Sequence, residues 1–144
     1  MKIEIREGFE KTEVIIKCPE ANEEIRKIES YLHGFDKQLT CTKNGVIKKI
    51  NIREVLYFET IDKLCFLYTL DDVFETTLKL YEIEDLLAYS GFIRNSKSQI
   101  LNIAKIDSLC PDFGGRIVAV MENGYQLIIS RQYSKSLKEK VGIK

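Results

Sequence analysis

The pattern of apolar and polar residues changes from helical to strand-like near residue 34. Before that point, residues 3–6 and 12–17 predict two short strands joined by a loop. Residues 20–32 follow with apolar side chains at spacings of three and four, which predicts an amphipathic helix that Gly34 ends. The first 34 residues therefore predict a small ββα extension. Because so few residues bury little apolar surface, we expect the extension to pack on the rest of the chain or on a second copy.

Beyond residue 34 the pattern consists of short strands separated by turns. Asn44-Gly45 and Asn123-Gly124 are the dipeptides that most strongly indicate tight hairpins. One short helix is predicted near residues 80–87, and another begins at about Arg131. The expected strands are residues 39–42, 46–50, 55–59, 64–70, 73–77, 99–101, 106–109, 117–121 and 125–129. Residues 35–144 therefore predict one domain of the mainly β (α+β) class.

Composition narrows the class of protein further. The chain has 144 residues, of which 44% are apolar, enough for one compact domain. Its longest apolar runs, such as residues 64–70, are much shorter than the roughly 20 residues that span a bilayer. The first residues lack the apolar core and cleavage site of a secretory signal, so we expect a cytoplasmic protein without membrane insertion.

Cysteine and histidine are too scattered to predict a metal site. The four cysteines stand singly at positions 18, 41, 65 and 110, and His33 is the only histidine. We expect buried structural thiols, with redox sensing by Cys65 or Cys110 as the alternative. No metal and no cofactor are expected. The sequence also shows no nucleophile with a neighbouring base and no glycine-rich phosphate loop, so we do not expect an enzyme.

Charge is distributed unevenly along a chain whose net charge is zero. Residues 1–34 contain 6 Lys and Arg against 8 Asp and Glu, whereas residues 91–144 contain 9 against 4. The last third is therefore positively charged, as the attraction of a polyanion requires.

Two segments of this basic region place cationic and amide groups beside apolar strands. Residues 92–102 contain Arg94 and Lys97 before the strand at 99–101, and residues 128–133 lead from a strand into the last helix. Groups at strand ends are well placed to meet a partner, because loops on a rigid scaffold commonly carry binding residues. The two segments therefore predict a binding module.

The residues at the start of the last helix indicate which ligand the predicted binding module prefers. Arg131 and Gln132 lie in its first turn, where free amides and the helix dipole attract phosphate, and Lys135 and Lys138 extend the charge along one face. Lysine and arginine bind phosphate or guanine, and glutamine suits adenine. Nucleic acid is the favoured ligand. The alternative is that Arg131, Lys135 and Lys138 only solvate a surface helix.

Three motifs in a fixed order carry a resemblance to a known family. They are Val55-Leu56-Tyr57-Phe58-Glu59, then Phe92-Ile93-Arg94-Asn95-Ser96-Lys97-Ser98-Gln99-Ile100-Leu101-Asn102, then Ile129-Ser130-Arg131-Gln132-Tyr133. They resemble I-x-Y-x-E, F-x-R-x-H-R-S-x-x-V-N and V-S-R-R-Y of the LytTR DNA-binding domain, an output domain of bacterial transcription regulators. The resemblance covers roughly residues 37 to 142 and implies elongated antiparallel β-sheets with short helices.

The resemblance also implies a partner and a set of contacts. The partner is double-stranded DNA with promoter repeats, read by loops that insert side chains into successive major grooves. Ser98 and Arg131 would suit phosphate, while Tyr133 would hold the scaffold by packing and Asn102 by capping a turn. The expected DNA-binding residues are Lys63, Cys65, Arg94, Lys97, Ser98, Arg131, Gln132 and Lys135.

Departures from the family pattern alter the expected readout. Ser96 stands where the family often has histidine, and Gln132 stands where it has a second arginine. Cys65 occupies a loop position that some members use for base reading, or it faces the core and leaves Lys63 as the contact there. We therefore expect a sequence preference different from that of relatives.

The first 34 residues are too few for a phosphorylatable receiver domain and lack its acidic cluster. The chain thus resembles the stand-alone members of the family, in which a response-regulator-like output domain carries only a short extension. Two interpretations of the extension stay open: a dimerisation element that makes the chain a homodimer, or a lid on the main core. For the whole chain, the rival to DNA binding is a protein-interaction or small-ligand sensor domain on an antiparallel sheet.

Overall fold

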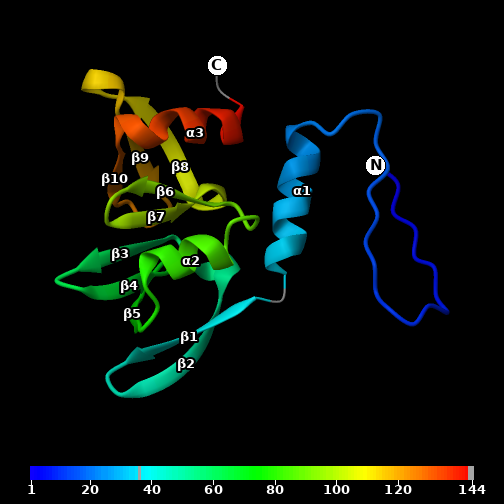
Figure 1. Cartoon of the computed structure of the whole chain (residues 1–144), viewed down its shortest axis with the longest axis horizontal. Coiled ribbons are helices and arrows are strands. Elements are labelled where there is room, and N and C mark those ends of the chain that lie inside the picture. The colour runs from blue at the N-terminus through cyan, green and yellow to red at the C-terminus, as the bar shows by residue number, and fades with distance from the viewer. Residues whose placement is uncertain (36, 143–144) are drawn as a thin grey trace.

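The computed structural model describes residues 1–35 and 37–142 and contains three α-helices among them (Figure 1). The helices are α1 (Glu23–Gly34), α2 (Leu80–Leu86) and α3 (Arg131–Val141). The strands are β1 (Gln38–Lys43), β2 (Val46–Asn51), β3 (Tyr57–Ile61), β4 (Leu64–Tyr68), β5 (Val73–Thr76), β6 (Phe92–Ser96), β7 (Gln99–Asn102), β8 (Ile106–Pro111), β9 (Ile117–Met121) and β10 (Gln126–Ile129). Single 3-10 turns lie at η1 (Ile52–Glu54), η2 (Ile103–Lys105) and η3 (Phe113–Gly115).

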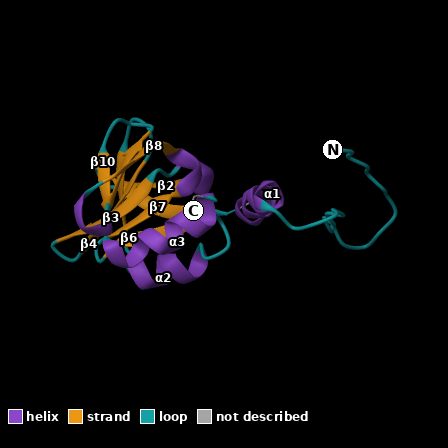
Figure 2. Cartoon of the chain, turned by 90° about the horizontal axis from the view of Figure 1, so that it is seen from above, coloured by secondary structure: helices purple, strands orange, loops and turns teal. Residues whose placement is uncertain are grey.

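The strands form two antiparallel sheets, which confirms the mainly β class. The larger sheet has seven strands in the order β2-β1-β5-β4-β3-β7-β6, and the smaller has three in the order β10-β9-β8. Both Asn-Gly dipeptides form the predicted hairpins, and Asn44 and Gly45 have the positive φ angles, 52° and 77°, that a tight two-residue turn requires. Helices α2 and α3 both contact β6, and β6 also contacts β10 of the smaller sheet (Figure 2).

Neighbouring residues of the central strands belong to two different apolar cores. In β3, Phe58 packs in a core with α2 while Tyr57 packs in a second core with the smaller sheet and α3. The same division separates Ile100 from Leu101 in β7. Since successive side chains of a strand point to opposite faces, the larger sheet is covered on both faces at this place. Each fully buried large apolar side chain contributes about 1.5–3 kcal/mol.

Strand β6 was not predicted, because its second half is polar. Phe92 enters the first core and Ile93 the second, but Arg94, Asn95 and Ser96 follow as charged and polar residues. The sequence therefore reads as a bend before one strand, whereas the structure forms a β6–β7 hairpin with its turn at Lys97 and Ser98.

The two strands predicted for residues 3–6 and 12–17 are absent from the described part of the chain, so that part of the ββα prediction is wrong. Residues 1–22 contain no strand, and every one of them is exposed. An isolated two-stranded hairpin is at best marginally stable, and no strand of residues 23–35 or 37–142 pairs with this segment as a third strand.

Helix α1 forms as predicted, although it begins at Glu23 rather than near residue 20. Asn22 caps it, because its side-chain oxygen accepts a hydrogen bond from the Ile25 N–H at 3.2 Å. At the other end, Gly34 lies so close to η1 that an added Cβ would be 3.0 Å from Ile52 Cδ1. The guanidinium of Arg53 lies over the Tyr31 ring, which ties the helix to the domain.

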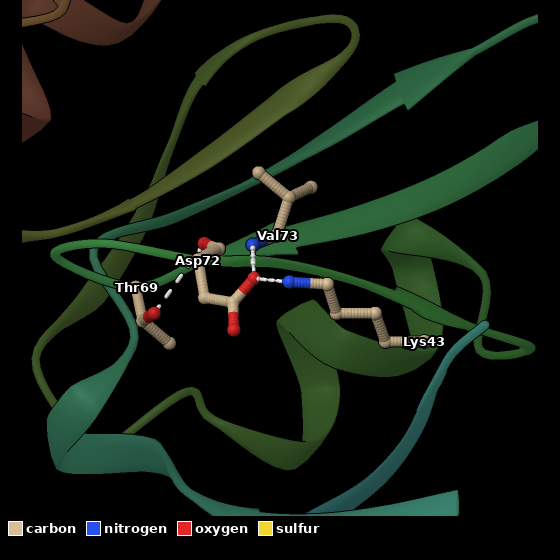
Figure 3. Close-up of polar contacts among 4 residues, drawn as sticks. All are labelled: Lys43, Thr69, Asp72 and Val73. Atoms are coloured by element: carbon tan, nitrogen blue, oxygen red, sulfur yellow. Dashed lines mark hydrogen bonds and ion pairs between the residues drawn. The ribbon is translucent and has the colours of Figure 1, made fainter. Parts of the chain in front are cut away.

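Within the larger sheet, the end of β1 is joined to the β4–β5 turn by an ion pair (Figure 3). The Asp72 carboxylate accepts a hydrogen bond from the Val73 N–H at 2.9 Å and pairs with the Lys43 ammonium at the end of β1. The hydrogen bond from Lys43 is the main reason that the pKa of Asp72 is lowered. This contact is therefore present at neutral pH, and it is lost as the pH falls through the lowered pKa.

Asn102 caps η2, as predicted, and also ties β7 to the segment before β3. Its buried side chain donates to the Val55 carbonyl at 2.9 Å and accepts from the Ala104 N–H at 3.1 Å. We expect Asn102→Ala to lower the free energy of unfolding by about 2–3 kcal/mol, because both partners lose a buried hydrogen bond. Urea denaturation measures this change.

Asn51→Ala is the matched control, because Asn51 caps η1 at a more exposed place and accepts only from Arg53, whose N–H lies at 3.0 Å. Its loss should cost about 1 kcal/mol. Equal losses in the two variants would contradict a special role for the buried amide of Asn102.

Candidate nucleic-acid interface

Two of the predicted contact regions lie side by side at one end of the larger sheet. The β3–β4 turn contains Lys63, and the β6–β7 turn contains Lys97 and Ser98. Strands β3 and β7 are neighbours, and at their shared end the Thr60 N–H donates to the Ser98 carbonyl at 2.8 Å. Both turns point to the left in Figure 1.

The β3–β4 turn has an unusual backbone. Asp62 and Lys63 both have positive φ angles, 50° and 68°, in a two-residue turn where glycine or asparagine is favoured. A left-handed conformation costs a non-glycine residue roughly 1–2 kcal/mol. The turn carries an exposed lysine at its tip in spite of this cost. Since the turn conformation itself does not favour lysine, this indicates a function for the lysine side chain.

The third region, the start of α3, is joined to β6 through Asn95. The Ser130 N–H donates to the Asn95 carbonyl at 2.8 Å, and the Asn95 side-chain amide donates to the Ile128 carbonyl at 3.2 Å. Asn95 is fully buried at an irregularity of β6, where one extra residue faces inward. Because Asn95 stands two residues before Lys97, the start of α3 lies at the same end of the sheet as the β6–β7 turn.

A polar relay continues from Asn95 across the sheet behind these turns. The Asn95 amide donates to Gln99 Oε1 at 2.7 Å, Gln99 Nε2 donates to Glu59 Oε2 at 2.5 Å, and the Tyr68 hydroxyl donates to Glu59 Oε1 at 3.2 Å. Burial, reinforced by the Glu59 carboxylate, raises the pKa of Tyr68 to about 12. The relay therefore crosses β6, β7, β3 and β4 and fixes the three regions relative to one another.

Six of the eight predicted contact residues are exposed. They are Lys63, Lys97, Ser98, Arg131, Gln132 and Lys135. The remaining two, Cys65 and Arg94, are held inside the domain.

Cys65 faces the core, so its inclusion among the DNA-contacting residues is wrong and the alternative given with it holds. Its side chain is only 4% exposed, in the apolar core of α2, with Thr60 and Thr76 on the flanking strands. Burial raises the pKa of the thiol to about 11, so the group is neutral at physiological pH. The alternation of β4 decides this, because Cys65 and Leu67 share the inner face.

Arg94 shapes the β6–β7 turn and does not project from it. Its Nη1 donates to the Lys97 carbonyl at 2.7 Å, and its Nε lies 3.4 Å from the Glu84 carboxylate of α2. The side chain is 18% exposed. Arg94 therefore positions the backbone that carries Lys97, with its own charge compensated by Glu84.

The first turn of α3 combines free amides with positive charge. Ser130 is the N-cap residue, as predicted, but its side chain makes no capping hydrogen bond, and the first turn contains no acidic residue. The Arg131 stem packs on Gly115, where an added Cβ would be 3.3 Å from Arg131 Cγ, and Ser134 donates to the Gly115 carbonyl at 2.7 Å. The helix start is thus fixed while its amides stay available to an anion.

Asn95, Gln99 and Thr60 are the positioning residues that the sequence analysis missed. Each stands in a strand, and each makes a hydrogen bond to another strand or to a turn. Asn95 lies among the charged and polar residues Arg94 and Ser96, so the sequence gives no signal that its side chain is buried or which strand it bonds.

These features define a class: a β-sheet domain that presents cationic and amide side chains from two turns and a helix start at one end, as a loop-based reader of nucleic acid does. The sequence model of the LytTr DNA-binding domain matches residues 45–142. The chain belongs to the LytTR family of DNA-binding domains.

Individual relatives agree with this assignment. Two proteins from different strains of Staphylococcus aureus are each 32% identical to the chain over 149 residues, which is 99% of either partner, and both carry the description "uncharacterized HTH-type transcriptional regulator". A solved LytTr DNA-binding domain from Bacillus cereus has the same fold, with a TM-score of 0.70 and 24% identity, and covers 75% of this chain and 99% of its own. In the present chain, strands follow both α1 and α2, so residues 1–35 and 37–142 contain no helix-turn-helix.

None of the helices described here has the length and apolar character needed to cross a membrane.

Proposed function

We propose that this chain is a cytoplasmic transcription regulator that binds double-stranded DNA sequence-specifically through the three regions at one end of the larger sheet. Lys63, Lys97 and Arg131 contact phosphates, with Ser98 beside them, and Gln132 reads a base edge. The β3–β4 turn, the β6–β7 turn and the start of α3 enter successive major grooves. Lys135 adds charge one helical turn further along.

The observation that carries this proposal is the way the three regions are joined. The Thr60–Ser98 bond fixes the first turn to the second, and the Asn95–Ser130 bond fixes the second to the start of α3. Since the backbones of the three regions are already ordered, binding loses little backbone conformational entropy there. Arg131 also opposes the dipole of its own helix, and a phosphate beside it removes that unfavourable interaction.

The test is selection of bound duplexes from a random pool, followed by measurement of affinity against salt concentration. We expect an enriched sequence. With three or four phosphate contacts, log K should fall with log salt with a slope of about −3 to −4. A pool that stays random, together with affinity independent of salt, would favour the rival protein-interaction or small-ligand function.

We further propose that the chain acts as a homodimer, with residues 1–34 as the dimerisation element. The support is that residues 1–22 are exposed along their whole length, whereas α1 lies against the domain at both of its ends, with Glu23 beside Gly142 and Gly34 beside Ile52. A lid on the core would instead have buried apolar side chains of this segment. Two-fold symmetry in the protein matches a DNA site whose two halves are inverted repeats of each other.

A further inference from the structure

The N-terminal segment exposes several large apolar side chains to solvent. Between 64% and 84% of the surface of each of five large apolar residues is in contact with solvent. They are Ile3, Ile5, Phe9, Val14 and Ile15. The segment forms no helix or strand and has no partner strand among the described residues, so its N–H and C=O groups are also free to pair.

Residues 13–17 have a charge pattern that is complementary to itself. Glu13 and Lys17 flank the apolar residues Val14, Ile15 and Ile16, and neither charge has an ion-pair partner in the part of the chain that the structure describes. If two copies of this segment run antiparallel about a two-fold axis at Ile15, Glu13 of each copy lies opposite Lys17 of the other.

The same arrangement pairs the apolar residues. Val14 lies opposite Ile16 of the second copy, and Ile15 lies opposite its own equivalent. Opposite charges and β-branched pairs directly across an antiparallel ladder are both stabilising. Because side chains alternate, the Val14–Ile16 pairs share one face and the Ile15 pair shares the other face with the charges.

Neighbouring registers lack this complementarity. Pairing about Val14 places Lys11 opposite Lys17, which is repulsive. Pairing about Ile16 places Glu13 opposite Pro19 and Lys17 opposite Ile15, so neither charge then faces an opposite charge.

We infer that two copies of this chain associate by antiparallel pairing of residues 13–17 about Ile15, with Glu13 and Lys17 forming two symmetric ion pairs between the copies. This inference deepens the homodimer proposed above and rests on it. It does not depend on which side chains contact DNA.

The test is sedimentation of the full-length chain at low salt and several concentrations. E13K makes positions 13 and 17 both positive, and K17E makes them both negative, so each variant should dissociate at about 10-fold higher concentration or more than the wild type. The double variant E13K/K17E should restore the wild-type dimer. An equimolar mixture of E13K with K17E should also dimerise, because each positive copy then faces a negative one.

The matched controls are E4K and R6E, which change equally exposed charges in the same segment. In the structure these two residues already pair with each other, with Arg6 Nε 3.3 Å from Glu4 Oε1, so their variants should sediment like the wild type. If E4K and R6E instead show the behaviour expected of E13K and K17E, the pairing register at residues 13–17 is wrong.

The remaining outcomes separate this inference from the proposals on which it builds. A wild-type chain that stays monomeric overturns the homodimer and this inference together. A wild-type dimer that E13K and K17E leave intact overturns the register alone. If the charge variants switch the dimer as expected but the chain binds no duplex, the DNA-binding proposal fails and the inference stands.

Discussion

Replacing Lys97 with alanine should weaken binding to a target duplex and to a scrambled duplex by the same factor, about 5- to 10-fold at low salt. Lys97 stands exposed at the tip of the β6–β7 turn, and in the proposed complex its ammonium contacts phosphate irrespective of sequence. The variant should also lower the magnitude of the salt slope by about 0.9. Electrophoretic mobility shifts on both duplexes, repeated at several salt concentrations, measure these changes.

Gln132→Ala should act differently, because an amide that reads a base edge contributes about 1–3 kcal/mol of discrimination. The target should lose affinity, the scrambled duplex should change little, and the salt slope should stay the same. Lys49→Ala is the control for charge. It removes the same charge from an exposed residue of β2, at the edge of the sheet opposite β6, and should leave both affinities unchanged. Equal losses for Lys97→Ala and Gln132→Ala on both duplexes would contradict the division of roles.

Asn95→Asp should be among the most destabilising single substitutions in the domain. The Asn95 amide donates to two oxygens, one of Gln99 and one of Ile128, and a carboxylate there would face both without a proton to share. With the residue fully buried, we expect the free energy of unfolding at neutral pH to fall by roughly 3 kcal/mol or more.

The same substitution has a defined pH dependence. Burial raises the pKa of the new carboxyl group above its unfolded value, so the neutral acid is favoured in the folded state. Stability should therefore recover as the pH falls toward 5 and be lost again as the pH rises through the raised pKa. Urea denaturation between pH 5 and 8 measures this. Asn22→Asp, at the exposed N-cap of α1, is the control and should show neither the loss nor this pH dependence.

The parts of the fold that depend on local chemistry could be predicted from the sequence. Asn-Gly pairs determine hairpins because few residues adopt positive φ easily, and Asn102 and Ser130 stand at turn and helix starts as their side chains favour. The strands predicted at residues 3–6 and 12–17 failed, because alternation shows which residues can form a strand and does not supply a partner strand.

The candidate site was predictable to a similar extent. The exposed lysines and the start of α3 follow from turns and helix caps, which are local. Cys65 points into the core because it alternates with its neighbours in β4, which the sequence offered only as an alternative. Arg94 is held by Glu84 of α2, and no local pattern indicates that contact. The link through Asn95 joins β6 to β10, and no spacing in the sequence indicates it.

The division of Tyr57 from Phe58, and of Ile100 from Leu101, between two cores also restricts how this domain can evolve. Deleting one residue inside β3 or β7 would turn side chains of that strand to the opposite face of the sheet. Aromatic and aliphatic residues of one core would then enter the other core, which is packed around side chains of different volume. Length changes are therefore tolerable in the loops and not in these two strands. Substitutions at the loop tips can therefore change which DNA sequences such a domain recognises, while the lengths of β3 and β7 stay constant.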